Sequence, residues 1–362
     1  MKYLICGDFT STKNNTELFR NKECDILFGD VRTVFDEADR VFVNVECALT
    51  ESENAIPKWG PNIKTPKEAA DVLKMVGVTD CGISNNHIFD YGCEGALDTM
   101  KALTNAGLNY TGFGNNYDDA RKNLYFQTPE GKTVAVITVS DREYCYALDD
   151  RMGARAYDEY DTMFDIIDAK KQADFVIVVY HGGKEFSRYP SPRLRKSCQA
   201  MAKHGADIVL CQHTHCVGCY ENFNGSHILY GQGNFHFAWD RTDDGWNDGL
   251  LVMAEITDKC EVSFIPVVKN KVGVQLANEQ EKKEILEGFE KRNKQLETDE
   301  WKQGWKDVCE AHRELYVSSV KNTWHEEESP NYIQHFAHYI DCEAHLDIYR
   351  ELFPTWNKTN EK

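Results

Sequence analysis

Polar side chains that could bind a metal ion follow five apolar runs of this chain. They are Asp8, Glu46, Asn86, His181 and the pair His213 and His215. Because the carboxyl ends of parallel strands meet at one edge of a sheet, we expect these side chains to lie close together. Carboxylate, imidazole and amide oxygen without thiolate suit manganese, iron or zinc, and a carboxylate can bridge two such ions about 3.5–4 Å apart. The sequence therefore predicts a site for two divalent metal ions (Mn, Fe or Zn).

Each of these residues also has a simpler interpretation when it is taken alone. Asp8 could form a turn or cap a helix, and Glu46 and His181 could be satisfied by buried neighbours. The spacing His213-Thr214-His215 in an extended segment would place both imidazoles on one side, as metal ligands often are. The repetition of such residues at five strand ends favours the metal site over these separate explanations.

The elements that would position this site are β-rich runs alternating with helical segments, which indicates an α/β fold with a largely parallel or mixed sheet. We predict strands over 3–6, 40–45, 79–84, 133–139, 174–180, 207–211, 227–230, 250–256 and 261–267. Helices are predicted over 66–75, 94–106, 160–172 and 192–204, with proline in the first turn of the first and the last.

Composition changes near residue 275. From Asn278 onward the chain is rich in Glu, Lys, Gln and Trp, and its apolar residues recur at helical intervals. We therefore predict a main domain over residues 1–275 and a helical extension over 276–362. The aromatic residues of this extension, including Trp301, Trp305 and Tyr339, are expected to pack against the main domain.

Charge and cysteine content limit the function and location. The chain has 362 residues and a formal net charge of −18, which repels phosphate backbones and argues against nucleic acid as the main partner.

An odd number of cysteines, 13, fits reduced thiols better than a disulfide framework. With no signal peptide and no transmembrane segment apparent, the expected location is cytoplasmic. Cys216 and Cys219 have the spacing of half a zinc knuckle, but ordinary buried thiols are the preferred interpretation.

These segments together resemble the CapA (poly-γ-glutamate capsule biosynthesis) family, over roughly residues 1–270. The most specific segment is Asn85-Asn86-His87-Ile88-Phe89-Asp90-Tyr91-Gly92; the others are Gly7-Asp8, Val43–Glu46, Gly112–Asn115, His181–Glu185, Gly205–His215 and Tyr230–Phe235. The family domain is a variant of the calcineurin-like metallophosphoesterase fold. The resemblance thus implies a four-layer α/β sandwich with mixed sheets, followed here by the helical extension.

The resemblance also implies a role for each residue. Asp8 and His215 would hold one ion, Asn86, His181 and His213 the other, and Glu46 would bridge them. His87 would be the general acid, since an imidazole can protonate a leaving group at neutral pH. Asp90 would either orient His87 or cap the following helix, and we favour the cap. Asn234 and Glu185 would support the ligands, although Asn234 could equally be a turn residue.

The chain departs from related phosphoesterases at two positions. Many of them have a histidine two residues after the first aspartate, where this chain has Thr10, and an aspartate where it has Glu46. One ion would therefore have one ligand fewer, which puts full phosphodiesterase activity in doubt.

Basic residues near His181 could bind the substrate. Arg188, Arg193 and Arg195 could clamp a carboxylate or phosphate, although a solvated basic face at the start of a helix is the preferred interpretation. The same alternative holds for Lys58, Lys64 and Lys184.

The function expected from this resemblance is a dinuclear metal-dependent hydrolase linked to capsule or poly-γ-glutamate biosynthesis or processing. Water or hydroxide would attack a phosphoester or an amide of an anionic polymer or a small-molecule substrate. The alternative is a non-catalytic metal-binding assembly factor whose helical extension binds a capsule synthase. A phosphatase of small metabolites is a third interpretation.

Overall fold

The computed structural model describes residues 1–354 except 244, 326 and 330, and its core is two mixed β-sheets. The first has the order β18-β17-β16-β1-β2-β5-β6, with β15 beside β1. Its strands are β1 (Lys2–Phe9), β2 (Arg40–Val45), β5 (Asp80–Gly82), β6 (Asn109–Thr111), β15 (Asn234–His236), β16 (Asp248–Ile256), β17 (Cys260–Lys269) and β18 (Val274–Leu276). Strands β1, β2, β5 and β6 run parallel, so their carboxyl ends share one edge.

The second sheet has the order β13-β14-β12-β11-β9-β8. Its strands are β8 (Leu124–Gln127), β9 (Thr133–Ser140), β11 (Phe175–His181), β12 (Ile208–Gln212), β13 (Tyr220–Phe223) and β14 (Ser226–Leu229). The four central strands are parallel. Two short pairs complete the strands: β3 (Ala48–Leu49) with β4 (Lys64–Thr65), and β7 (Phe113–Gly114) with β10 (Gly153–Ala154).

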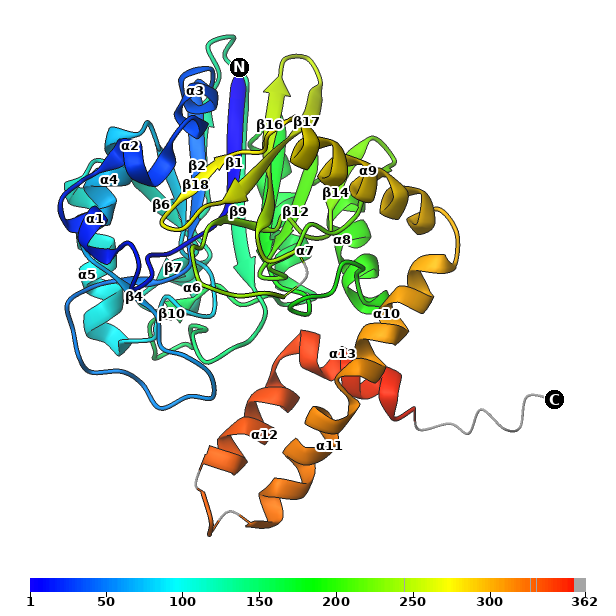
Figure 1. Cartoon of the computed structure of the whole chain (residues 1–362). Helices are drawn as coiled ribbons and strands as arrows, with labels where there is room; N and C mark the ends of the chain where they lie inside the picture. Colours follow the sequence, from blue (N-terminus) through cyan, green and yellow to red (C-terminus); the bar gives the residue numbers. More distant parts are fainter. Residues whose placement is uncertain (244, 326, 330, 355–362) are drawn as a thin grey trace.

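The two sheets pack face to face and are covered by helices on their outer faces (Figure 1). Alternate residues of β11 show this: Ile177 belongs to the apolar cluster between the sheets, whereas Val176 and Val178 face helices. Since both faces are buried, the strand is a continuous apolar run rather than an alternating one. The expected four-layer α/β sandwich with mixed sheets is confirmed.

The helices of the main body cover the two outer faces. Over the first sheet lie α1 (Thr16–Arg20), α2 (Cys24–Phe28), α3 (Val31–Asp36), α4 (Ala69–Met75) and α5 (Gly92–Asn105), and over the second lie α7 (Asp161–Lys170) and α8 (Pro192–Lys203); α6 (Tyr117–Ala120) is a single turn. Ser191 is the N-cap of helix α8, and its hydroxyl accepts a hydrogen bond from the Leu194 N–H. Pro192 occupies the first turn of the helix. The nine predicted strands and four predicted helices are all present within a few residues.

The C-terminal extension is helical, as expected, but it does not pack only against the main domain. It comprises α9 (Glu279–Leu296), α10 (Glu300–Ala311), α11 (Arg313–Asn322), the 3-10 turn η1 (Thr323–His325), α12 (Asn331–Asp341) and α13 (Glu343–Leu352). Ile285 of α9 joins the cluster between the sheets, and Trp301 of α10 packs against the second sheet. Trp305 and Tyr339 instead belong to a small core formed by α10–α13.

The arrangement of the extension brings its last helices back toward the main body (Figure 1). Helices α11 and α12 project from the body, and α13 returns beneath it. Residues 355–362, the end of the predicted extension, lie outside the described residues, and the boundary at 275 stays a prediction. No helix in the described part of the chain is long and apolar enough to cross a membrane.

We predict that Ile177→Ala lowers the free energy of unfolding by about 2–5 kcal/mol, because the side chain is fully buried between the sheets and its loss leaves a cavity. Denaturant titration followed by circular dichroism measures this change. Phe164→Ala is the control, since this α7 side chain is 58% exposed. Equal effects of the two substitutions would contradict the position of Ile177 in the core.

Candidate metal centre

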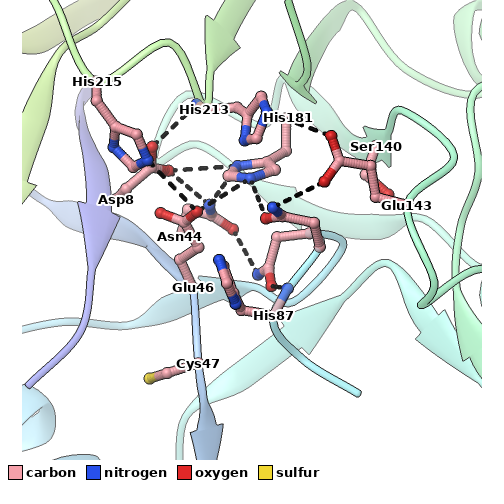
Figure 2. A network of polar contacts seen from close by, with 12 residues as sticks. Asp8, Asn44, Glu46, Cys47, His87, Ser140, Glu143, His181, His213 and His215 are labelled. Carbon is pink, nitrogen blue, oxygen red and sulfur yellow. Dashed lines mark hydrogen bonds and ion pairs between the residues drawn. The ribbon is translucent and has the colours of Figure 1, made fainter. Parts of the chain in front are cut away.

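The carboxyl ends of the two sheets meet at a cluster of buried carboxylates and imidazoles (Figure 2). Ligand atoms of Asp8, Glu46 and His215 lie within 4.8 Å of one another, and so do those of Glu46, His181 and His213. Glu46 is common to both groups. The structure therefore brings these residues together in two overlapping sets, each able to hold one cation.

Glu46 is the central residue of this cluster. Its side chain is fully buried, and neither carboxylate oxygen accepts a hydrogen bond from any residue that the structure describes. His181 Nε2 lies 3.3 Å and His215 Nε2 4.0 Å from Oε1 of this carboxylate. A buried carboxylate without hydrogen bonds is costly, and a bound cation removes that cost. The donor set thus fits divalent metal ions.

Asn234 orients His215. Its Nδ2 donates to the carbonyl oxygen of Trp246 at 2.8 Å, so its Oδ1 faces His215 Nδ1 at 2.9 Å and requires a proton there. The lone pair of His215 is then on Nε2, the nitrogen nearest to Glu46. The expected supporting role of Asn234 agrees with this geometry.

Asn86 presents its amide oxygen to the cluster. The Nδ2 group donates to Glu143 Oε2 at 3.0 Å, which directs Oδ1 toward His181 Nε2 at 3.0 Å. An amide oxygen is a ligand for hard divalent cations. Asn86 therefore lies where it could add a fourth ligand to the Glu46–His181–His213 set.

The segment that carries His213 and His215 is a turn, which corrects the expected extended geometry. Their φ angles are 78° and 54°, in the left-handed region that non-glycine residues rarely adopt. Asp8 Oδ2 accepts a hydrogen bond from the His213 backbone N–H at 2.9 Å and so helps to hold the turn. The two rings approach the cluster because of this turn and not because of strand alternation.

The electrostatics of the cluster favour positive charge. Burial lowers the pKa of His181, but Glu46 and Asp8 outweigh burial and raise this pKa to about 10. Burial raises the pKa of Asp8, but His181, His215 and Asn44 outweigh it and lower this pKa to about 2. The carboxylates therefore attract positive charge to this place, whether as protons or as metal ions.

His87 lies beside the cluster and is held by two charged side chains. Its Nδ1 is 2.7 Å from Asp90 Oδ2 and 3.1 Å from Lys58 Nζ, while Lys58 also pairs with Asp90. The preferred interpretation of Asp90 as a helix cap was wrong: Tyr91 is the N-cap of α5, and Asp90 accepts from the backbone N–H of Ile63. Asp90 therefore orients His87 and leaves its Nε2 available to a ligand.

A cavity of about 300 Å³ adjoins the cluster. One wall comes from the main body, where it includes His87, Lys184, Glu185 and His213; the opposite wall includes His312, His338, Tyr339 and His345 of the extension. Trp59 stacks on His335 of α12, with ring centroids 3.9 Å apart, where the two walls meet. The extension thus helps to enclose the space next to the candidate metal ligands.

The arginines predicted to bind substrate do not line this cavity. Arg193 pairs with Asp347 of α13 at 2.9 Å, and Arg195 pairs with Glu221 at 2.8 Å. Arg188 donates to the carbonyl oxygen of Val217 at 3.3 Å. These contacts indicate that the three arginines have a structural role and do not bind substrate. Arg193, for example, joins α8 to α13.

Lys58, Lys64 and Lys184 differ in their surroundings. Lys58 and Lys184 line the cavity, and the side chain of Lys58 is only 3% exposed, so neither belongs to a solvated face. Lys64 instead pairs with the exposed Glu53. The positive charge on the cavity wall therefore comes from Lys58, which is paired with Asp90, and Lys184.

Glu185 also lines the cavity, and one of its oxygens lies within 4.8 Å of nitrogens of His213 and His215.

Sequence reasoning missed two residues of the site. Glu143 lies in the loop that follows β9, and its Oε1 lies 3.5 Å from His213 Nε2. Burial raises the pKa of Glu143, but His213 and His338 outweigh burial and lower this pKa well below its ordinary value. Asn44, two residues before Glu46, donates to Asp8 Oδ1 at 2.7 Å.

Thr10 does not approach the cluster as a ligand would. Its hydroxyl contacts Thr65 Oγ1 at 3.3 Å and the Ser11 carbonyl oxygen at 3.2 Å. The nearby His236 does not replace the expected histidine, because its ring packs among Phe9, Phe19 and Phe28. Within the described residues, the ligand set of Asp8, Glu46 and His215 thus contains one imidazole, that of His215.

The cysteines agree with their expected state. No disulfide joins any two of the thirteen cysteines, all of which lie in the described part of the chain. Cys216 and Cys219 are buried, and within that part neither belongs to a group of side chains that could hold a metal ion.

Comparisons with known proteins identify relatives of this chain. The family model "Bacterial capsule synthesis protein PGA_cap" matches residues 2–238. The chain is 32% identical to "PGA biosynthesis protein CapA" of Bacillus subtilis (strain 168), over 66% of this chain and 64% of that protein. It is 31% identical to "Capsule biosynthesis protein CapA" of Bacillus anthracis, over 66% of this chain and 61% of that protein. The matches thus span less than two thirds of both relatives.

A third relative and a solved structure are more distant. A "Probable polyglutamine synthesis accessory protein" of Mycobacterium tuberculosis (strain ATCC 25618 / H37Rv) is 28% identical, over 57% of this chain and 58% of that protein. The crystal structure of 5'-nucleotidase from Candida albicans SC5314 aligns with a TM-score of 0.43 and 12% identity, over 87% of this chain and 58% of that one. At this TM-score the fold assignment rests on the sheets and helices described above.

We predict that Glu46→Gln abolishes most of the rise in melting temperature that Mn²⁺ or Zn²⁺ gives the native chain, because it removes the carboxylate common to both sets of ligands. Thermal unfolding with added metal and with chelator, together with metal analysis, measures the effect. Glu17→Gln is the control, since this carboxylate is 79% exposed. Equal metal content and equal stabilisation in the two variants would refute the metal centre.

Proposed function

The chain belongs to the bacterial capsule synthesis protein family PGA_cap, and we propose that it is a hydrolase dependent on two divalent metal ions that acts in the synthesis or processing of a capsule or poly-γ-glutamate polymer. The observation that carries this proposal is the buried carboxylate of Glu46, which has no hydrogen bond from the described residues and lies between two sets of ligands. The link to polymer comes from the names of the relatives.

The ligands of the two ions are assigned from the overlapping sets. Asp8 and His215 would hold one ion, Asn86, His181 and His213 would hold the other, and Glu46 would serve both. Two divalent cations at such a site lower the pKa of a bound water and stabilise negative charge on the reacting oxygen. Manganese, iron and zinc all suit these oxygen and nitrogen ligands.

The side chains of the cavity bind the substrate and supply the proton. Lys58 and Lys184 attract an anionic group, a phosphate or a carboxylate, into a space that also contains His87. Asp90 accepts a hydrogen bond from Nδ1 of His87, so the imidazolium form of His87 can give its Nε2 proton to the leaving oxygen or nitrogen and become neutral. The substrate is therefore an anionic phosphoester or amide, such as a γ-glutamyl bond.

We predict that His87→Asn lowers kcat by about 100- to 10,000-fold with little change in bound metal, because the substitution removes the proton donor but none of the metal ligands. Assays of the manganese- or zinc-loaded chain on a generic phosphodiester, a phosphomonoester and γ-glutamyl peptides measure this effect and reveal the substrate class. His204→Asn on the exposed end of α8 is the control. Hydrolysis that survives His87→Asn unchanged would exclude His87 as the general acid.

A non-catalytic assembly factor is the second candidate function, and Thr10 is the observation that favours it. With Thr10 directed at Thr65, the Asp8 side has a single imidazole, which weakens binding of that ion. One relative is named an accessory protein. In this case the fold and its extension would serve a synthase partner without turnover.

The two functions differ in what the site must do inside the cell. We predict that cells producing only the His87→Asn variant make altered amounts or lengths of polymer if the chain is a hydrolase. Polymer yield and length after replacement of the native gene measure this. Polymer identical to that made with the native chain, together with no hydrolysis of any test substrate, would support the assembly factor.

A further inference from the structure

A second cluster of metal-binding side chains lies between the main body and the extension. Ligand atoms of Glu143, Cys342 and His345 lie within 4.8 Å of one another, and all three side chains are buried. Glu143 belongs to the loop after β9, Cys342 is the N-cap of α13, and His345 is in its first turn. The two sides of this cluster are thus about 200 residues apart in sequence.

The atoms of this cluster are already at distances that suit a small cation. Cys342 Sγ lies 3.3 Å from Glu143 Oε1. Tetrahedral zinc, with a Zn–S distance of about 2.3 Å and a Zn–O distance of about 2.0 Å, requires a separation of about 3.5 Å between such atoms. The hydroxyl of Tyr316 contacts His345 Nδ1, which leaves Nε2 of that ring for a ligand.

His338 supplies an independent sign of an unsatisfied site. Its side chain is only 9% exposed, and neither ring nitrogen has a hydrogen-bond partner among the described residues. Nε2 nonetheless lies 3.4 Å from Glu143 Oε2, and the ring is 4.7 Å from that of His345 between centroids. A buried imidazole without hydrogen bonds is costly, so the polar groups beside this cluster do not fully satisfy one another.

We propose that Glu143, Cys342 and His345 hold a third divalent cation, zinc by preference, that fastens the C-terminal extension to the main body. Thiolate, imidazole and carboxylate are all ligands that zinc accepts, and three protein ligands leave the fourth tetrahedral position to a water molecule. The set includes a thiolate, unlike the set around Glu46, so the two sites differ in metal preference.

This third site touches the proposed dinuclear centre through Glu143. The same carboxylate accepts from Asn86 Nδ2 and lies 3.5 Å from His213 Nε2. A cation on Glu143 therefore fixes the partner that orients the amide oxygen of Asn86. The third cation orders the cavity wall and positions a ligand of the dinuclear centre.

The test is the zinc content of the full chain at equilibrium with excess Zn²⁺, measured by equilibrium dialysis with the free zinc subtracted. We expect three zinc ions per native chain and two per Cys342→Ser chain. With Co²⁺ in place of zinc, the native chain should show a thiolate-to-cobalt charge-transfer band that Cys342→Ser lacks. Cys309→Ser, which alters another buried cysteine of the extension, is the matched control and should behave as the native chain does.

The outcomes separate this proposal from the proposed function. If Cys342→Ser and Cys309→Ser bind equal amounts of zinc and give the same cobalt spectrum, the third site does not exist, whatever the dinuclear centre does. If Glu46→Gln loses two ions but keeps the cobalt band, both sites exist and are separate. A native chain with one ion that Cys342→Ser loses supports the third site and refutes the dinuclear centre. His345→Ala serves as a second variant if Cys342→Ser fails to fold.

Discussion

The site depends on one electrostatic constraint: a carboxylate, that of Glu46, is fully buried and receives no hydrogen bond from the described residues. Burial of such a group is tolerated only where positive charge compensates it. Glu46 follows a strand of the first sheet, whereas His181 and His213, which can compensate its charge, lie at the carboxyl ends of strands of the second. The way the two sheets pack therefore decides whether the cluster forms at all.

Most of the fold and the main ligands follow from local patterns in the sequence. Strands such as β9 and β11 are rich in Val and Ile, and the topological rule for parallel strands correctly places the ends of neighbouring strands together. Helices α1–α3 have five or six residues each, too short for a helical period to emerge, and they were missed. Glu143 could have been found by applying the same rule to the end of β9.

Other features depend on contacts between distant segments and could not be predicted. Arg193 has the type and position of a substrate ligand, but its partner is Asp347, which only the return of α13 brings within reach. Asp90 has the spacing of a helix cap, yet Lys58 and His87 compete successfully for its carboxylate. The cavity wall of His338, Tyr339 and His345 likewise requires the whole extension to fold back.

The sharing of Glu46 between two sets of ligands has a consequence for how the site fills. In the proposed centre, the first cation to arrive would neutralise the carboxylate that both sets use and would then repel the second across a few ångströms. Occupancy of the two positions would therefore be anticooperative, with stepwise affinities. The Asp8 position, with a single imidazole, would fill last and empty first, so its cation would exchange with the surrounding pool more readily than its neighbour.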